Sequence, residues 1–172
     1  MNPETTTLYG HSLGAHIVGI AGQNVTKKVN HTIGCDPAWP LFVSVPENER
    51  LSPDDALHVE VIHTNAGLWG CPDKLGHYDF YPNGGSSQKG CKDDLISACS
   101  HGRSFQYLAE QILNPGPDFC SLKCTSYSEF TEKTCEKEIA FMGGISSYPA
   151  NPGTYYFETN DIEPFSLSSE CA

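Results

Sequence analysis

The hydrophobic and polar positions near the start of the chain change from a strand pattern to a helix pattern within a few residues. Residues 5–9 form a β-prone run, and small and apolar side chains at helical spacing follow from residue 13 to residue 22 or 24. Gly10, Ser12 and Gly14 lie at the junction in the order Gly-x-Ser-x-Gly. This segment predicts a strand, a sharp turn and a helix, with glycines on both sides sparing Cβ clashes and Ser12 at the turn.

Further stretches along the chain have the pattern of strands and helices. A short apolar run predicts a buried strand over 31–35, and the prolines after it place Asp36 at its carboxyl end. The clearest strand is expected over 56–64, and because both its faces mix polar and apolar residues we place it towards one side of the sheet. We also expect an aromatic strand over 76–85, a helix with an apolar stripe over 100–113 and a last strand over 153–159.

These elements predict one α/β domain with a mostly parallel sheet. In open parallel sheets the ligand site lies beyond the carboxyl ends of the strands, so Ser12 and Asp36 are expected at the same edge of the sheet. The length of 172 residues allows one domain with a genuine core.

Composition excludes several classes of partner and indicates the compartment. The formal net charge of -11, with only 10 Lys and Arg, argues against nucleic acid and against a polybasic membrane anchor. No apolar run approaches the length of a transmembrane segment. Eight cysteines without paired zinc-type knuckles indicate disulfides and secretion, and two glycosylation sequons, at Asn24 and Asn30, agree.

The candidate chemistry is that of a serine nucleophile. A serine alcohol needs a histidine base held by a carboxylate, and α/β-hydrolases carry the three in the order serine, acid, histidine. Asp36 and His101 supply that order, and the backbone N–H of Leu13 is the expected oxyanion donor. The alternatives are a chance Gly-x-Ser-x-Gly in a glycine-rich chain, an Asx-turn at Asp36 and a plain helix-start residue at His101.

The other histidines are expected to have other roles. Two flank the predicted turn and should lie on its backbone or on the outer helix, and three belong to strands or precede one, where structural hydrogen bonding is expected; they are His11, His16, His58, His63 and His77. No His-Glu-x-x-His or other clustered ligand set is present, so a metal hydrolase is not expected.

Six ordered motifs together resemble the animal pancreatic-lipase family. They are Gly10-His11-Ser12-Leu13-Gly14-Ala15-His16, Gly34-Cys35-Asp36-Pro37-Ala38, Val61-Ile62-His63-Thr64-Asn65, Asp79-Phe80-Tyr81-Pro82-Asn83-Gly84-Gly85, Gly90-Cys91 and Cys99-Ser100-His101-Gly102-Arg103-Ser104. The similarity is greatest to the phospholipase A1-like members, including those of insects. It implies an α/β-hydrolase fold and a secreted lipid esterase with Ser12, Asp36 and His101 as its triad, needing no cofactor for catalysis.

Two departures from the family's triglyceride lipases bear on the substrate. The cysteine-closed lid of those lipases is much longer than the loop between Cys91 and Cys99, and the connection over 65–75 also looks shortened. A small lid and a low wall admit a bulky polar head group, so we expect cleavage of the sn-1 ester of phospholipids at a lipid interface. The alternatives are neutral glycerides, or a non-catalytic lipid-binding protein like the yolk proteins that resemble lipases but lack the nucleophile.

The resemblance also implies a possible structural calcium site. The loop 46–55 is similar to the family's calcium loop, with Glu47, the Arg50 carbonyl and Asp55 at ligand positions. Ser52 stands where the family usually has an aspartate, and the loss of a charged oxygen ligand should weaken the site.

Disulfide pairing is only partly implied by the family. Eight cysteines allow 105 pairings, and the resemblance supports Cys91–Cys99 and Cys124–Cys135. For the remaining four we expect Cys35–Cys71 and Cys120–Cys171, with a buried free thiol at Cys35 as the alternative.

The start of the chain lacks features that the family carries. Several strands precede the nucleophile turn in the family, as does a loop with the second oxyanion donor, and neither is in residues 1–172. The first residues also lack the charged start and apolar stretch of a secretory signal. We therefore expect the chain to be the C-terminal portion of one catalytic domain, truncated before the strand that carries Ser12. Loss of one oxyanion donor typically lowers the rate on the order of a hundred- to a thousand-fold, so weak activity is expected.

Overall fold

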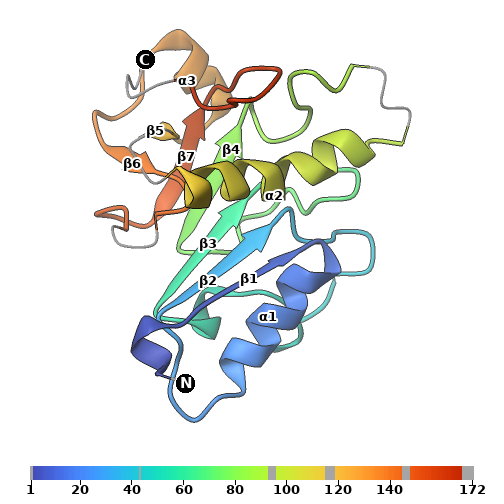
Figure 1. The fold of residues 1–172 in the computed structure, drawn as a ribbon, viewed down its shortest axis with the longest axis vertical. Coiled ribbons are helices and arrows are strands. Elements are labelled where there is room, and N and C mark those ends of the chain that lie inside the picture. Colours follow the sequence, from blue (N-terminus) through green and yellow to red (C-terminus); the bar gives the residue numbers. More distant parts are fainter. Residues whose placement is uncertain (1, 43, 93–95, 115–118, 145–147, 168–172) are drawn as a thin grey trace.

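The fold is a seven-stranded mixed sheet flanked by helices (Figure 1). In this computed structural model the described residues are 2–42, 44–92, 96–114, 119–144 and 148–167. The strands are β1 (Thr7–His11), β2 (His31–Cys35), β3 (His58–Ile62), β4 (Tyr78–Pro82), β5 (Cys120–Lys123), β6 (Ile139–Phe141) and β7 (Gly153–Phe157). The α-helices are α1 (Leu13–Gln23), α2 (Ala98–Leu113) and α3 (Tyr127–Glu132), and short 3-10 turns cover Pro3–Thr5, Glu47–Glu49 and Pro53–Asp55.

The sheet is parallel over most of its width. Its strand order is β1-β2-β3-β4-β7-β5-β6, and β1, β2, β3, β4 and β7 pair in parallel, whereas β5 runs antiparallel to both β7 and β6. The carboxyl ends of the five parallel strands therefore lie along one edge, called here the carboxyl edge. The expected α/β-hydrolase class, with its mostly parallel sheet, is confirmed.

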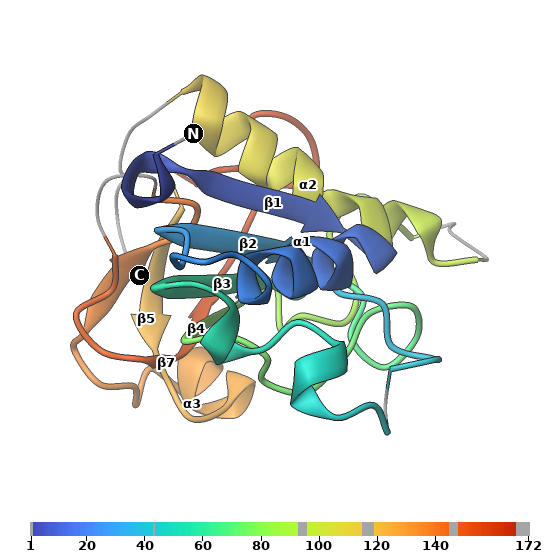
Figure 2. The ribbon, with the colours of Figure 1, turned by 90° about the horizontal axis from the view of Figure 1, so that it is seen from below.

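Helices α1 and α2 cover opposite faces of the sheet. Successive strand residues point to opposite sides, so neighbouring residues of one strand contact different helices. Val59 and Val61 of β3 pack in one apolar cluster with Ala15 of α1. Ile62, the next residue along, packs in another cluster with Tyr107 of α2. Figures 1 and 2 show the two helices on the two sides of the strands, with α2 lying across the sheet. In the described part of the chain no helix is both long and apolar enough to span a bilayer.

Strand β3 lies third in the order, between β2 and β4, with both faces covered. The expectation that it lies towards one side of the sheet was wrong. The charged residue Glu60 had indicated a partly exposed strand. Glu60 is instead fully buried, and it accepts a hydrogen bond from the Gly143 N–H (2.6 Å). A charged side chain on a strand thus marked an internal hydrogen bond and not an exposed face.

Strands β5 and β6 and helix α3 lie in a segment to which the sequence pattern assigned no element. The two strands are short and lie at the far side of the sheet, where they have too few residues for a clear alternation. Helix α3 has only six residues, and its N-cap, Ser126, accepts a hydrogen bond from the Glu129 N–H (3.2 Å).

The cysteines confirm two expected disulfides and contradict a third. Cys91–Cys99 and Cys124–Cys135 are bonded. Cys35 and Cys71 are both free and buried, so the expected bridge between them was wrong and the alternative of a free thiol at Cys35 was right. They cannot meet because Cys35 packs in the cluster under α2 and Cys71 in the cluster under α1, on opposite faces of the sheet. Burial raises the pKa of both thiols. The expected bridge to Cys171 ends on a residue outside the described part.

Candidate active site

Ser12 occupies a strained turn between β1 and α1. Its backbone has φ 58° and ψ -121°, a region that non-glycine residues rarely adopt. The turn is held by three backbone bonds: the Ser12 N–H donates to the Cys35 carbonyl (3.0 Å), and the Ser12 carbonyl accepts from the N–H groups of Ala15 (3.1 Å) and Ala38 (3.2 Å). The strain and the bonds that enforce it present the serine side chain at the carboxyl edge.

The two glycines of the motif differ in their roles. A Cβ atom on Gly10 would lie 2.2 Å from the Gly14 carbonyl oxygen, a distance that only glycine at position 10 avoids. A Cβ atom on Gly14 would meet nothing within 4 Å among the described residues. The expectation that both glycines relieve clashes is therefore confirmed for Gly10 and wrong for Gly14.

Asp36 lies immediately after β2 with its carboxylate fully buried. One oxygen, Oδ1, accepts hydrogen bonds from the backbone N–H groups of Thr64 (2.8 Å) and Asn65 (3.0 Å), just beyond β3. The other, Oδ2, lies 2.6 Å from Nδ1 of His101. Gly70 closes the site from the loop after Asn65, since a Cβ atom there would lie 2.3 Å from Oδ1. The carboxylate is thus fixed in one orientation by the ends of two neighbouring strands.

His101 reaches Asp36 from the first turn of α2, 65 residues further along the chain. An ionised carboxylate only accepts hydrogen bonds, so Nδ1 of His101 carries a proton, and in the neutral imidazole Nε2 then has none. That is the tautomer that can accept a proton from a serine hydroxyl. Within the described residues the Ser12 hydroxyl makes no hydrogen bond to His101. Such contacts are often long before substrate binds, and the residue next to Ser12 does contact the base.

His11 makes that contact, a role that its sequence position did not predict. Its Nε2 lies 3.0 Å from the main-chain carbonyl oxygen of His101, and the two imidazole rings are 4.3 Å apart. The pattern had placed His11 on the backbone of its own turn. The available signal was its position at the end of the nucleophile strand, one residue before Ser12 and therefore on the edge where the base must arrive.

Two further features border the site. Leu13 is the first residue of α1, so its N–H has no carbonyl one turn earlier to bond within the helix. The indole N–H of Trp69 donates to the Ile96 carbonyl (2.6 Å), which ties the loop after β3 to the loop closed by Cys91–Cys99. The Trp69 ring lies 6.4 Å from that of His101. The part of the lid loop at residues 93–95 lies outside the described residues.

His58, His63 and His77 make structural hydrogen bonds, as expected, and so does His16 of α1. His63 is fully buried between the Cys71 carbonyl (2.9 Å) and Asp79 (2.9 Å). His16 bonds the Ala38 carbonyl and the Leu51 N–H, and His58 and His77 each bond one neighbouring group. None of these four rings contacts Asp36 or His101 in the described structure.

The loop expected to hold calcium is closed by its own side chains. Both carboxylate oxygens of Asp55 accept bonds from Ser52, one from its N–H (2.8 Å) and one from its hydroxyl (3.1 Å). The Glu47 carboxylate is largely exposed and lies 3.7 Å from the Arg50 guanidinium. No group of three Asp, Glu, His or Cys side chains in the described residues could hold a metal ion. The donor set thus does not fit a tightly bound cation, and calcium binding stays a prediction of the resemblance.

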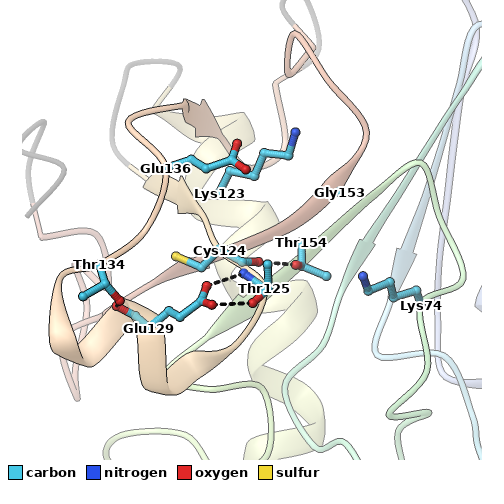
Figure 3. Close-up of a pocket in the computed structure, with 9 residues that line it drawn as sticks. All are labelled: Lys74, Lys123, Cys124, Thr125, Glu129, Thr134, Glu136, Gly153 and Thr154. Carbon is cyan, nitrogen blue, oxygen red and sulfur yellow. Dashed lines mark hydrogen bonds between the residues drawn. The ribbon is translucent and has the colours of Figure 1, made fainter.

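A cavity of about 320 Å³ lies beside the start of β7 (Figure 3). Gly153, the first residue of β7, lines it together with Lys74, Thr125 and Glu129. The Glu129 carboxylate is bonded to Thr125, and Lys74 enters from the other side. Because β7 runs parallel to β1 and β4, this cavity is at the amino ends of the strands and does not belong to the site of Asp36 and His101.

Comparison with known proteins decides the family. The family model described as Lipase matches residues 1–165. The chain belongs to the lipase family. It is similar to pancreatic lipase-related protein 2 of Rattus norvegicus (40% identical; 78% of this chain and 33% of the relative) and of Cavia porcellus (44%; 77% and 31%). It is also similar to pancreatic lipase-related protein 3 of Homo sapiens (36%; 95% and 42%). The chain thus spans about a third to two-fifths of the length of these curated relatives.

Proposed function

We propose that this lipase-family chain is a secreted carboxylic-ester hydrolase that acts on lipids through Ser12, His101 and Asp36. The observation that carries the proposal is the 2.6 Å hydrogen bond between His101 Nδ1 and the buried Asp36 carboxylate, beside the strained turn of Ser12. Family membership supports a lipid substrate. The two disulfides in the described residues support an oxidising compartment.

The proposed reaction assigns one task to each group. His101 Nε2 takes the Ser12 proton as the hydroxyl oxygen attacks the ester carbonyl, and the Leu13 N–H stabilises the oxyanion. Asp36 orients His101 and stabilises its imidazolium. The proton then passes to the leaving alcohol oxygen, and water hydrolyses the acyl-serine in a second round of the same chemistry.

Within lipids, we propose the sn-1 ester of phospholipids as the preferred substrate. The Cys91–Cys99 bridge closes a short loop. The connection over 65–75 lies close to Asp36 at Gly70, where a Cβ atom would be 2.3 Å from Oδ1. We expect a short lid and a short wall to leave room for a polar head group beside the ester. Neutral glycerides are the competing substrate, and they need a larger apolar surface over the site.

Product analysis tests this proposal. The purified chain is incubated with phosphatidylcholine carrying different acyl chains at sn-1 and sn-2, and in parallel with triacylglycerol, using Ser12→Ala as the matched control. We expect release of the sn-1 fatty acid that is lost in Ser12→Ala. Faster release from triacylglycerol would overturn the phospholipid preference. Equal release by wild type and Ser12→Ala would overturn the enzymatic proposal and favour a lipid-binding role.

A further inference from the structure

We propose that His11 is a positioning residue for the base, fixing the main chain of His101 against the strand that carries the nucleophile. The inference rests on the proposed function, because it concerns the same site. It assigns to the histidine before Ser12 a role distinct from those of the three reacting groups.

The first step is the hydrogen bond itself. His11 Nε2 lies 3.0 Å from the main-chain oxygen of His101, across 90 residues of sequence. A carbonyl oxygen can only accept, so Nε2 of His11 must carry the proton and donate it. The His11 side chain is half-buried, which shields this bond from competing water.

The His11 bond fixes the position of His101 relative to β1. His101 belongs to the first turn of α2, and Ser12 follows β1, so the chain itself does not hold the nucleophile and the base at a fixed distance. The Asp36 bond anchors the imidazole of His101 at Nδ1, and the His11 bond anchors the same residue at its main chain. Within α2 the Ser104 hydroxyl donates to the same carbonyl (3.0 Å), which holds the first turn of the helix but does not connect it to β1. The His11 bond makes that connection, so together with the Asp36 bond it limits the movement of the His101 ring relative to Ser12.

The third step concerns the charge of the His11 ring. It lies 4.3 Å from the His101 ring and 5.1 Å from the uncharged Phe105 ring. A protonated His11 would repel the imidazolium that forms at His101 during the reaction. Burial is the main cause that lowers the pKa of His11, and the charge of His101 adds to the lowering, whereas the hydrogen bond to the His101 carbonyl and the charge of Asp36 oppose it. The ring is therefore neutral at neutral pH and donates its hydrogen bond without adding charge beside the base.

Two substitutions separate the hydrogen bond from the packing. His11→Phe keeps an aromatic ring but has no donor, whereas His11→Gln keeps an amide N–H near the position of Nε2. Ser12 labelling by a fluorophosphonate probe is followed over a range of probe concentrations. We expect His11→Phe to lower the maximal labelling rate by about 10- to 100-fold with an unchanged half-saturating concentration, and His11→Gln to restore most of it. An unchanged rate in His11→Phe, or an equal loss in His11→Gln, would overturn the inference.

A second readout does not depend on reactivity. The proton on His101 Nδ1, bonded to Asp36, gives a downfield proton NMR resonance that Asp36→Asn removes and so identifies. We expect this resonance to exchange faster with water in His11→Phe and to be retained in His11→Gln. Should His11→Phe not fold, His11→Asn, whose shorter amide does not reach the His101 carbonyl, replaces it.

The two readouts distinguish the two failures. If wild type is not labelled but the resonance responds to the variants as expected, the proposed function fails and the positioning role stands. If Ser12 is labelled and neither the rate nor the resonance changes in the variants, the proposed function stands and the role of His11 is overturned.

Discussion

The substitution Asp36→Asn tests the geometry of the site most sharply, because the structure dictates how the amide must lie. Two backbone N–H groups, from Thr64 and Asn65, point at Oδ1 of Asp36. An asparagine must place its oxygen there, which puts its NH2 group where Oδ2 now lies, 2.6 Å from His101 Nδ1. Two donors would then face each other, so His101 must move its proton to Nε2 and can no longer accept one from Ser12.

The expected magnitude follows from that change of tautomer. In serine proteases the equivalent substitution lowers the rate on the order of 10⁴-fold while the geometry is kept. At about 1.4 kcal/mol for each factor of ten, this corresponds to roughly 5.5 kcal/mol of transition-state stabilisation. The two backbone N–H bonds to the side chain of residue 36 are retained and the bond to His101 only reverses its direction, so the melting temperature should fall much less than the reactivity.

The assay is the rate of Ser12 labelling by a fluorophosphonate, measured together with thermal unfolding. Glu60→Gln is the matched control, because Glu60 is also a fully buried acid beside a histidine, 3.6 Å from His31 at the amino end of β2. We expect Glu60→Gln to label at the wild-type rate. A folded Asp36→Asn protein that labels within tenfold of wild type would show that Asp36 does not set the tautomer of His101.

Three further predictions concern stability. Gly10→Ala should destabilise the fold by about 1–3 kcal/mol or more, because the Cβ of the alanine would lie 2.2 Å from the Gly14 carbonyl oxygen. Gly14→Ala should be neutral or slightly stabilising. Equal effects of the two substitutions in urea unfolding would contradict this. Removal of calcium by EGTA should leave the wild-type melting temperature unchanged, because Ser52 already occupies the Asp55 carboxylate. The variant Ser52→Asp adds a carboxylate beside Asp55, and its melting temperature should rise with added calcium. A loss of wild-type stability in EGTA would count against the closed loop. Burial lowers the pKa of His16 in the folded state, so unfolding takes up a proton below about pH 6.5. The same sign holds for His11, His58 and His77, and the melting temperature should therefore fall from pH 7 to pH 5. A rise of the melting temperature over that interval would be the contrary result.

Much of the site could be predicted from the sequence because its parts have local signatures. The Gly-x-Ser-x-Gly turn and the Asp-Pro after a buried strand are short motifs, and the rule that parallel strands end at one edge brings Ser12 and Asp36 together. His101 needed the family resemblance, since a histidine at a helix start has no distinctive pattern of its own. The structure places its imidazole on Asp36.

What could not be predicted depends on how distant segments face one another. The role of His11 requires knowing that the first turn of α2 lies over the end of β1. The pairing of Cys35 with Cys71 failed because their side chains point to opposite faces of the sheet, which spacing along the chain does not reveal. Glu60 made a central strand look peripheral because its hydrogen-bond partner, Gly143, is 83 residues away.

The central claim is that Ser12 is a nucleophile activated by His101, and the most direct measurement is to locate the covalent adduct by mass spectrometry. The chain is treated with a fluorophosphonate, digested and sequenced, with His101→Gln treated in parallel. We expect one phosphonyl group on Ser12 in the wild type and its near-complete loss in His101→Gln. A wild-type adduct on another residue, or equal modification of Ser12 in both proteins, would contradict it.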